Sequence, residues 1–293
     1  MKSLNIKWLF LIVLSLIWGS SFILIKKALL GLSPFQLGSL RTLITGLILF
    51  LAGFNSLKAI PKHKWKWLAI SGFLGSFFPA YFFAIAETEI DSAVVSILNS
   101  LVPLNTILIG FFLFKINSTK RQTLGVVIGF TGTILLILKG AELNPGQNYW
   151  FAGFVIASTL MYATNTNIIK KHLQDIKPIA IATANYIFIA IPALLILIWD
   201  DFFTAKTLDN EALAPSLIYV VILSLFGTAL AKILYNKLVQ ISTPVFASSV
   251  TYLMPVIALA WGVLDGEKFG LLQLAATLLI LLGIYLSHRR KKA

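Results

Sequence analysis

Long apolar segments dominate the sequence, and each is close to the length that a helix needs to cross a lipid bilayer. Such a helix needs about 20 mostly apolar residues, because a rise of 1.5 Å per residue must span roughly 30 Å of hydrocarbon. Ten segments meet this requirement: 8–26, 34–54, 67–86, 92–114, 123–139, 149–169, 178–199, 216–236, 244–264 and 269–287. We therefore predict an all-α integral membrane protein with ten transmembrane helices.

The composition excludes other classes of chain. Hydrophobic residues make up 58% of the 293 residues and charged residues 12%, whereas soluble domains contain about 45–50% apolar and about 25% charged residues. This hydrophobicity also excludes a disordered chain. The absence of cysteine excludes a disulfide-stapled secreted module.

The net charge of +13 is distributed unevenly along the chain. If the N-terminus is cytoplasmic, 18 of the 24 Lys and Arg residues fall on the inner side and only Lys26, Lys27, Lys139, Lys206 and Lys268 on the outer side. Of the eleven acidic residues, only Asp175 falls inside. Positive charge favours the cytoplasmic side, so we expect both termini to be cytoplasmic. The expected partner of this charge is the anionic inner leaflet, not nucleic acid.

The two halves of the chain align with each other. A shift of 144 residues places the segment 18–22 on 162–166, Lys26 and Lys27 on Lys170 and Lys171, and Pro34 on Pro178. A shift of 152 residues places Gly75 on Gly227, Phe83 on Tyr235, Ser96 on Ser248 and Pro103 on Pro255. We predict two five-helix repeats, residues 1–142 and 143–293. Because five is odd, the second repeat is inverted, an architecture whose substrate site lies near the bilayer midplane.

The sequence resembles the EamA-type members of the drug/metabolite transporter superfamily. The resemblance rests on the order of short motifs: Trp18-Gly19-Ser20-Ser21-Phe22, Pro34 with Arg41, Asn99 to Pro103, Gly125 and Gly132 after Gln122, Pro178, Gly227 to Asn236, Ser248 to Pro255, and Glu267 before Gln273 to Gly283. It implies alternating-access transport of a small metabolite, often the export of amino acids or related compounds. We expect a location in the bacterial inner (cytoplasmic) membrane.

Arg41 is a charged residue within a predicted span. It lies about seven residues into the second span, roughly 10 Å below the outer surface. A charge in the bilayer persists only with a partner or in a wet cavity. One hypothesis is that Arg41 contacts an anionic group of the substrate. The alternative is a structural brace that pairs Arg41 with Glu87 or Asp91.

The first and sixth spans carry candidate substrate contacts. Aromatic and neutral hydrogen-bonding side chains lie near mid-depth on these helices: Trp18, Ser21, Tyr162, Asn165 and Asn167. They suit a small amphiphilic solute. The alternative is close helix packing through the small residues 19–21.

Prolines predict hinges in three further spans, and the family resemblance implies that these three spans and the eighth move as gates. Pro103 and Pro255 each remove a helical hydrogen bond, and Pro79 does so in the third span. The polar or aromatic neighbours of these prolines are candidate substrate contacts: Tyr81, Asn99, Asn105, Ser248, Thr251 and Tyr252, with Tyr235 beside Asn236 in the eighth span. Interhelical bonding or a lipid-facing ring is the alternative. Lys232 is expected to reach water at the inner end of its span.

The fifth and tenth spans are rich in small residues that suit tight packing. Gly125 and Gly129 form a GxxxG spacing with Gly132 close by, and the tenth span offers Ala276 and Gly283. We assign these spans to scaffold or to a homodimer contact.

The sequence lacks the residues that metal binding, ATP-driven transport and proton coupling commonly need. The histidines His63, His172 and His288 fall in cytoplasmic loops or tail, so we expect no metal site and no other cofactor. No phosphate-binding Gly-rich loop appears, which argues against ATP-driven transport. The sequon at Asn117 faces the cytoplasm. No acid lies deep in a span, since Glu87 is at an outer end, and this favours facilitated diffusion or exchange.

Three other functions remain open at this stage. The same fold with more than one deep cation would suit phosphorylated or nucleotide-linked sugars. A lipid-modifying membrane enzyme would need Asp, Glu and His clustered at one interface, but the acid cluster at Glu87, Glu89 and Asp91 has no histidine. A sensor or scaffold that transports nothing is the third alternative.

Overall fold

The computed structural model describes residues 2–114 and 120–288, and within these ranges the regular secondary structure is helical. The α-helices are α1 (Lys2–Ala28), α2 (Pro34–Gly53), α3 (Trp65–Gly72), α4 (Phe78–Ala86), α5 (Ser92–Asn99), α6 (Val102–Phe114), α7 (Lys120–Leu143), α8 (Ala152–His172), α9 (Pro178–Trp199), α10 (Ala205–Leu208), α11 (Leu213–Ile222), α12 (Ala231–Ile241), α13 (Pro244–Ser248), α14 (Met254–Leu264) and α15 (Leu271–His288). The predicted all-α membrane fold is confirmed. The sequon at Asn117 lies outside the described residues.

Seven helical stretches in the described part are long and apolar enough to span a membrane: Ile6–Ala28, Pro34–Ala59, Lys62–Ala86, Ser92–Leu113, Pro178–Trp199, Leu213–Ile241 and Pro244–Leu264. Val127–Lys139 and Leu271–Gly283 are shorter apolar helices. α8 has 21 residues but includes several Ser, Thr and Asn residues, which lower its hydropathy. The number of ten spans therefore stays a prediction.

Several helices begin where proline and a capping residue place them. Ser33 Oγ accepts the N–H of Gln36, whose side-chain oxygen accepts the N–H of Ser33 in return, and Pro34 occupies the first helical position. This capping box satisfies donors that have no partner within the helix. Pro178 and Pro244 likewise occupy the first positions of α9 and α13, and Thr243 Oγ1 accepts the N–H of Phe246 at the start of α13. Both predicted starting positions, 178 and 244, agree with the structure.

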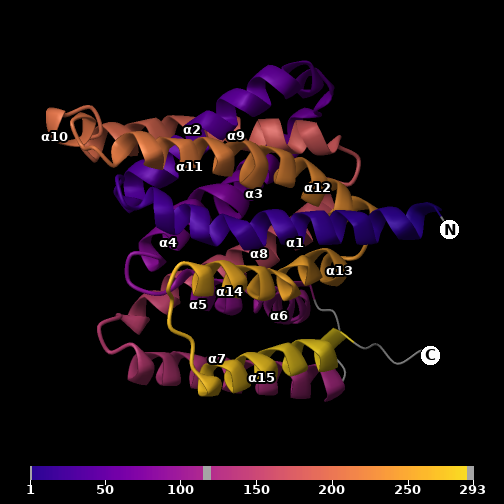
Figure 1. Ribbon diagram of the computed structural model, residues 1–293. Coiled ribbons are helices and arrows are strands. Elements are labelled where there is room, and N and C mark those ends of the chain that lie inside the picture. The colour runs from indigo at the N-terminus through magenta and orange to yellow at the C-terminus, as the bar shows by residue number, and fades with distance from the viewer. Residues whose placement is uncertain (1, 115–119, 289–293) are drawn as a thin grey trace.

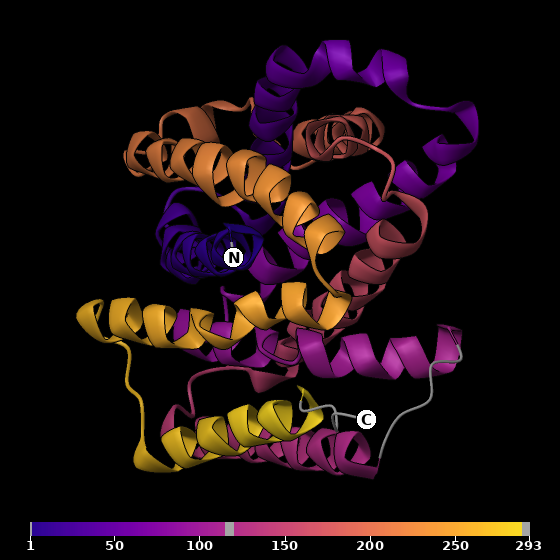
Figure 2. The same cartoon turned by 90° about the vertical axis from the view of Figure 1, so that its right-hand side faces the viewer.

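Helix α1 runs through the middle of the bundle, and helices from both halves of the chain pack around it (Figures 1 and 2). α7 and α15 form a pair on one side of the molecule in both views. Gly283 lies so close to Gly125 and Gly129 that a side chain there would clash with backbone, and Gly132 packs against Ala276 in the same way. These small-residue faces therefore meet each other within the chain, where they support the scaffold role.

Loops that were predicted to share one side of the membrane contact one another. α1 begins and α15 ends at the same end of the bundle (Figure 1). At the other end, which we call the acid-rich end (Glu87, Asp91, Asp200, Asp265 and Glu267), Lys26 Nζ lies 2.8 Å from Glu267 Oε1 and 3.3 Å from Asp265 Oδ2.

The end that holds the start of α1 has its own contacts. There, Lys64 Nζ lies 2.7 Å from Asp175 Oδ1, and this ammonium holds the pKa of Asp175 below its usual value. The two groups of loops are thus separated by the length of the helices. Which group faces the cytoplasm stays a prediction.

Four passages of the chain are interrupted helices. α3 and α4 are joined by the π-helical turn η3 (Phe73–Phe77), and α11 and α12 by the π-helical stretch η5 (Leu223–Leu230). α5 and α6 are separated at residues 100–101, and α13 and α14 by the 3-10 turn η6 (Ser249–Tyr252). Pro79, Pro103 and Pro255 each lie in the first turn after an interruption. The breaks occur at corresponding places in the two halves.

Candidate functional site

A cavity lies among the helices that surround α1. Its lining residues are Trp18, Ser21, Phe22, Ile25, Arg41, Thr42, Gly75, Ser76, Ala80, Phe83, Asn99, Val102, Tyr162, Asn165, Thr166, Tyr186, Gly227, Thr228, Lys232, Tyr235, Thr251 and Met254. They come from α1, α2, α4, α5, α6, α8, α9, α12 and α14 and from the turns η3, η5 and η6. None of these described lining residues belongs to α7 or α15. Both halves of the chain thus build one site.

The cavity brings together most of the residues that the sequence singled out: Trp18, Ser21, Arg41, Asn99, Tyr162, Asn165, Tyr235 and Thr251 line it. Tyr81, Ser248 and Tyr252 do not. Tyr81 is buried against Gly38 and its hydroxyl lies 2.9 Å from Ser39 Oγ. Ser248 donates to the carbonyl of Val245 at 3.0 Å within its own turn. Tyr252 packs against the main hydrophobic core. These three side chains therefore lie outside the cavity lining.

Arg41 extends from α2 toward the second half of the chain. Its Nε donates to Thr228 Oγ1 at 2.9 Å, and the Thr228 hydroxyl donates to the carbonyl of Leu223 at 3.0 Å. Among the described residues, Arg41 forms no ion pair within 4.0 Å. The acid brace expected at Glu87 or Asp91 is therefore absent there, and a hydroxyl positions the guanidinium in the cavity wall.

Lys232 corrects an expectation. It was expected to extend toward water at the end of its span, but its ammonium donates to the backbone carbonyl of Gly75 and lines the cavity. Helix α12 turns this face inward because Lys232 lies between the buried residues Ala231 and Tyr235. The described lining residues therefore include two cations, Arg41 and Lys232, and no acid.

Three prolines leave backbone carbonyls of cavity-lining residues without their usual helical donor. A proline lacks the N–H that would reach the carbonyl four residues earlier. For Pro79, Pro103 and Pro255 these carbonyls belong to Gly75, Asn99 and Thr251, and all three residues line the cavity.

In the η5 stretch, which has no proline, a carbonyl also loses its usual helical donor. The N–H of Ala231 bonds to Phe226 and Thr228, so the carbonyl of Gly227 is left to accept Trp18 Nε1 at 2.9 Å. A π-helical turn of this kind often marks a functional position. The cavity thus contains acceptors as well as cations.

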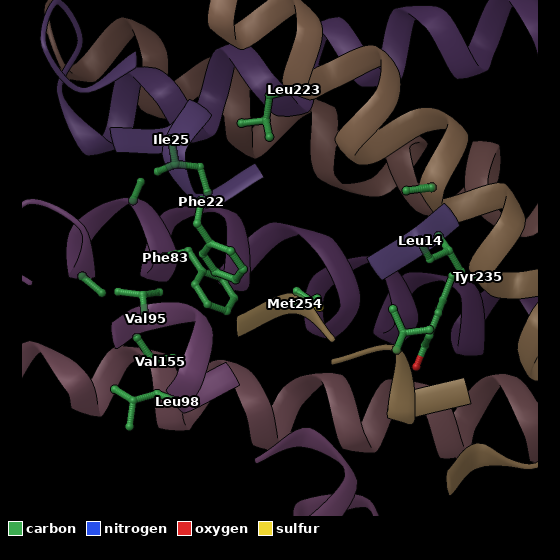
Figure 3. Packing of buried hydrophobic residues seen from close by; sticks show 14 of the residues in the cluster. Leu14, Phe22, Ile25, Phe83, Val95, Leu98, Val155, Leu223, Tyr235 and Met254 are labelled. Carbon is green, nitrogen blue, oxygen red and sulfur yellow. The ribbon is translucent and has the colours of Figure 1, made fainter. Parts of the chain in front are cut away.

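Aromatic rings form much of the remaining wall. The ring of Trp18 lies 5.2 Å from that of Tyr235, and the Tyr235 hydroxyl lies 2.7 Å from Thr166 Oγ1. Phe83 stacks on Tyr162 at 5.9 Å and meets Phe22 edge-on at 5.8 Å. Figure 3 shows the rings of Phe22 and Phe83 next to each other, with Met254 to their right. These surfaces suit the apolar part of a small solute.

Three asparagines within the bundle have different environments. Asn105 donates to Thr159 Oγ1 at 2.8 Å and so connects α6 to α8, which supports interhelical bonding for this residue; Asn167 bonds its own helix at Ala163. Asn99, by contrast, lines the cavity, and its Oδ1 has no hydrogen-bond partner. A free acceptor at this position could receive a donor from a solute.

Sequence reasoning missed several lining residues, namely Thr42, Gly75, Ser76, Tyr186, Gly227 and Thr228 as well as Lys232. Gly75 and Gly227 had been aligned between the halves, and this was the available signal. A side chain at Gly75 would lie 2.7 Å from Asn165 Cγ, and one at Gly227 would lie 2.8 Å from Ser21 Oγ. Tyr186 follows Asn185 on α9, and this polar neighbour was the signal available for it.

The described residues contain no group of three or more His, Cys, Asp or Glu side chains that could hold a metal ion. Trp67 stacks on His172 with ring centroids 3.7 Å apart, and this histidine lies at the bundle end that contains Lys64.

An all-helical membrane bundle with a cavity built by both halves of the chain is the architecture of many membrane carriers. Comparison with known families agrees. The EamA-like transporter family matches residues 6–138 and again residues 150–289, so the chain belongs to this family.

Individual proteins support the same assignment. The chain is 28% identical to a Salmonella typhimurium protein named "probable amino-acid metabolite efflux pump", over 92% of this chain and 91% of that one. It is 26% identical to the "uncharacterized inner membrane transporter YedA" of Escherichia coli, over 94% of this chain and 90% of that one. A crystal structure with 18% identity superposes with a TM-score of 0.65 over 96% and 95% of the two chains, which shows a shared fold.

Proposed function

We propose that this transporter moves small metabolites that carry an anionic group, amino acids first among them, and that it exports them by alternating access. The observation that carries the proposal is the pair of cations in one cavity, Arg41 and Lys232, with no acid among the described lining residues. A charge within a bilayer is costly without a partner. An anionic solute would supply that partner for both cations.

An amino acid would match the other groups in the cavity. Its carboxylate would lie between Arg41 and Lys232, and its ammonium could donate to Asn99 Oδ1 or to a carbonyl freed by the proline breaks. Its side chain would lie against Trp18 and Tyr235. The name of the Salmonella relative supports this class of solute.

The movement proposed here uses the interrupted helices. We propose that residues 1–142 and 143–293 form two inverted five-helix repeats in the bacterial inner membrane, with both termini in the cytoplasm. The matching breaks at η3 and η5, and at residues 100–101 and η6, support corresponding hinges in the two halves. Pro79, Pro103 and Pro255 would act at these hinges. The repeated family match supports the duplication.

Phosphorylated or nucleotide-linked sugars are the second candidate, because two cations in one site suit a phosphate better than one would. The test is uptake into proteoliposomes that contain the purified protein, with labelled amino acids, sugar phosphates, nucleotides and organic cations as separate probes. We expect at least one amino acid to equilibrate and organic cations to stay outside. Movement of organic cations alone would contradict the proposal, and movement of sugar phosphates alone would favour the second candidate.

A further inference from the structure

Glu87 is a buried carboxyl group that the proposed solute site does not use. It lies at the C-terminal end of α4, only 7% of it is exposed, and neither carboxyl oxygen has a hydrogen-bond partner. Its backbone N–H donates to the carbonyl of Phe83 at 3.0 Å, and Phe83 lines the cavity. The carboxyl group therefore lies one helical turn beyond the cavity wall.

The surroundings of Glu87 oppose a negative charge. Burial removes the carboxylate from water, and the C-terminal end of a helix carries a partial negative charge of its own. Burial first, and then the neighbouring Glu267, raise the pKa of Glu87 well above its usual value, whereas Lys26 and Arg41 oppose this shift. A proton is thus favoured on this side chain.

The charged groups that face Glu87 are already engaged. Glu267 accepts Lys26 Nζ at 2.8 Å, Ser92 Oγ at 2.6 Å and the N–H of Ala93 at 3.1 Å. Asp265 pairs with Lys27 and with Lys26, and Arg41 donates to Thr228. We call Lys26, Lys27, Asp265 and Glu267 the Lys26 cluster. It contains two cations and two carboxylates, so an ionised Glu87 would be a third anion without a cation of its own.

The Lys26 cluster joins three parts of the chain. Lys26 belongs to α1, Ser92 and Ala93 begin α5, and Glu267 lies in the loop between α14 and α15. α5 carries Asn99 to the cavity. An ionised Glu87 would repel Glu267 and compete for Lys26, which would weaken this junction. A protonated Glu87 leaves the junction intact.

We propose that Glu87 is a proton-binding site of this carrier, loaded while the Lys26 cluster is closed and released when the cluster opens, so that protons move with the solute cycle. The coupling rests on the transport function proposed above, but the proton site does not. The position of Glu87 at the end of a span favoured facilitated diffusion. The burial of its side chain instead favours a bound proton, and hence proton coupling.

The proton site is tested without any solute, by the thermal stability of the purified protein as a function of pH. Because the pKa of Glu87 is raised in the folded state, ionisation costs stability as the pH rises above the unfolded value of about 4.3. Glu87→Gln should therefore melt above the wild type by at least about 2 °C at neutral pH, with the difference vanishing near pH 4. Glu89→Gln, two residues away, should follow the wild type at both values. A Glu87→Gln variant that is equally stable or less stable at neutral pH would overturn the proton site.

The coupling is tested in proteoliposomes that contain a trapped pH-sensitive dye. An imposed gradient of the amino acid that the uptake screen identifies should change the internal pH with the wild type and with Glu89→Gln. With Glu87→Gln the amino acid should move without a pH change. Wild-type transport with no pH change would overturn the coupling. If no amino acid moves, the proposed function fails, while the stability comparison still decides the proton site.

Discussion

The ammonium of Lys232 on α12 donates to the backbone carbonyl of Gly75, which lies in the π-helical turn η3 of the other half of the chain. Pro79 lacks the N–H that would have reached this carbonyl in a regular helix. A cation from one half is thus held by an interruption in the other, and it lies in the cavity with Arg41. This arrangement supports the proposal that the cavity binds an anion.

Removal of the Lys232 charge should weaken the binding of an anionic solute. A hydrogen bond to a charged group contributes about 1.5–3 kcal/mol, so Lys232→Met should lower affinity by roughly 10- to 150-fold. Lys237→Met changes an exposed lysine on the same helix and should have no effect. Scintillation proximity binding of the labelled amino acid found by uptake measures both. Equal affinity in Lys232→Met and the wild type would remove Lys232 from the site.

Gly75 has no room for a side chain. In Gly75→Ala the new methyl group would lie 2.7 Å from Asn165 Cγ, and overpacking of this kind costs about 1–3 kcal/mol. The melting temperature of the purified protein should fall, and transport should fall with it. Gly153→Ala is the matched control, because nothing lies within 4 Å of a methyl group there, and its melting temperature should be unchanged or slightly higher.

Asp265 should stabilise the protein at neutral pH, whereas Glu87 should destabilise it there. Its bond with Lys27, together with Lys26, keeps the pKa of Asp265 below its usual value despite partial burial. A depressed pKa gives stability that is present above the unfolded value of about 3.9 and is lost as the pH falls through the folded value. Asp265→Asn should therefore lower stability at neutral pH by about 0.5–1 kcal/mol, because the pair is partly exposed.

The same melting experiment, repeated at decreasing pH, provides the check on Asp265. The wild type and Asp265→Asn should converge as the pH drops below about 3.9. Asp209→Asn, an exposed change elsewhere at this end of the bundle, should match the wild type throughout. A deficit of Asp265→Asn that does not depend on pH would contradict the ion-pair account.

Trp18 contributes a hydrogen bond as well as a ring. Trp18→Phe removes the 2.9 Å bond from Nε1 to Gly227 but keeps an aromatic face toward Tyr235. The loss of one neutral hydrogen bond, about 0.5–1.5 kcal/mol, should weaken the solute affinity by about 2- to 10-fold. Trp150→Phe is the control, because that ring is 91% exposed. Concentration-dependent uptake would show no difference between the two variants if Trp18 had only a packing role.

Periodicity and length were sufficient to predict the class of fold. The starts of α9 and α13 follow from Pro178 and Pro244, because proline at the first helical position leaves a signal in the sequence. The interruptions were less visible. Proline indicated three of them, but η5 contains no proline, and only the structure shows its π-helical hydrogen bonds and its packing against α1 and α2.

The site was predictable where a polar residue stands out in an apolar span, as Trp18, Arg41 and Asn99 do. The site was not predictable where the direction of a helix face decides whether a side chain enters the cavity. Lys232 and Tyr252 both lie near ends of helical segments, and only the direction of each helix face places Lys232 in the cavity and Tyr252 in the core. Glu87 was judged by its position in a span, whereas the packing around it determines its burial.

Equilibrium binding to the purified protein shows whether the cavity recognises an anion, when the transported amino acid is compared with its amide, which lacks the carboxylate charge. The wild type should bind the amino acid at least about tenfold more tightly than the amide, since one charge-assisted contact contributes about 1.5–3 kcal/mol. The Arg41→Gln, Lys232→Met double variant should lose this preference, and Lys237→Met should keep it. Equal binding of amino acid and amide by the wild type, or an undiminished preference in the double variant, would contradict an anion site in this cavity.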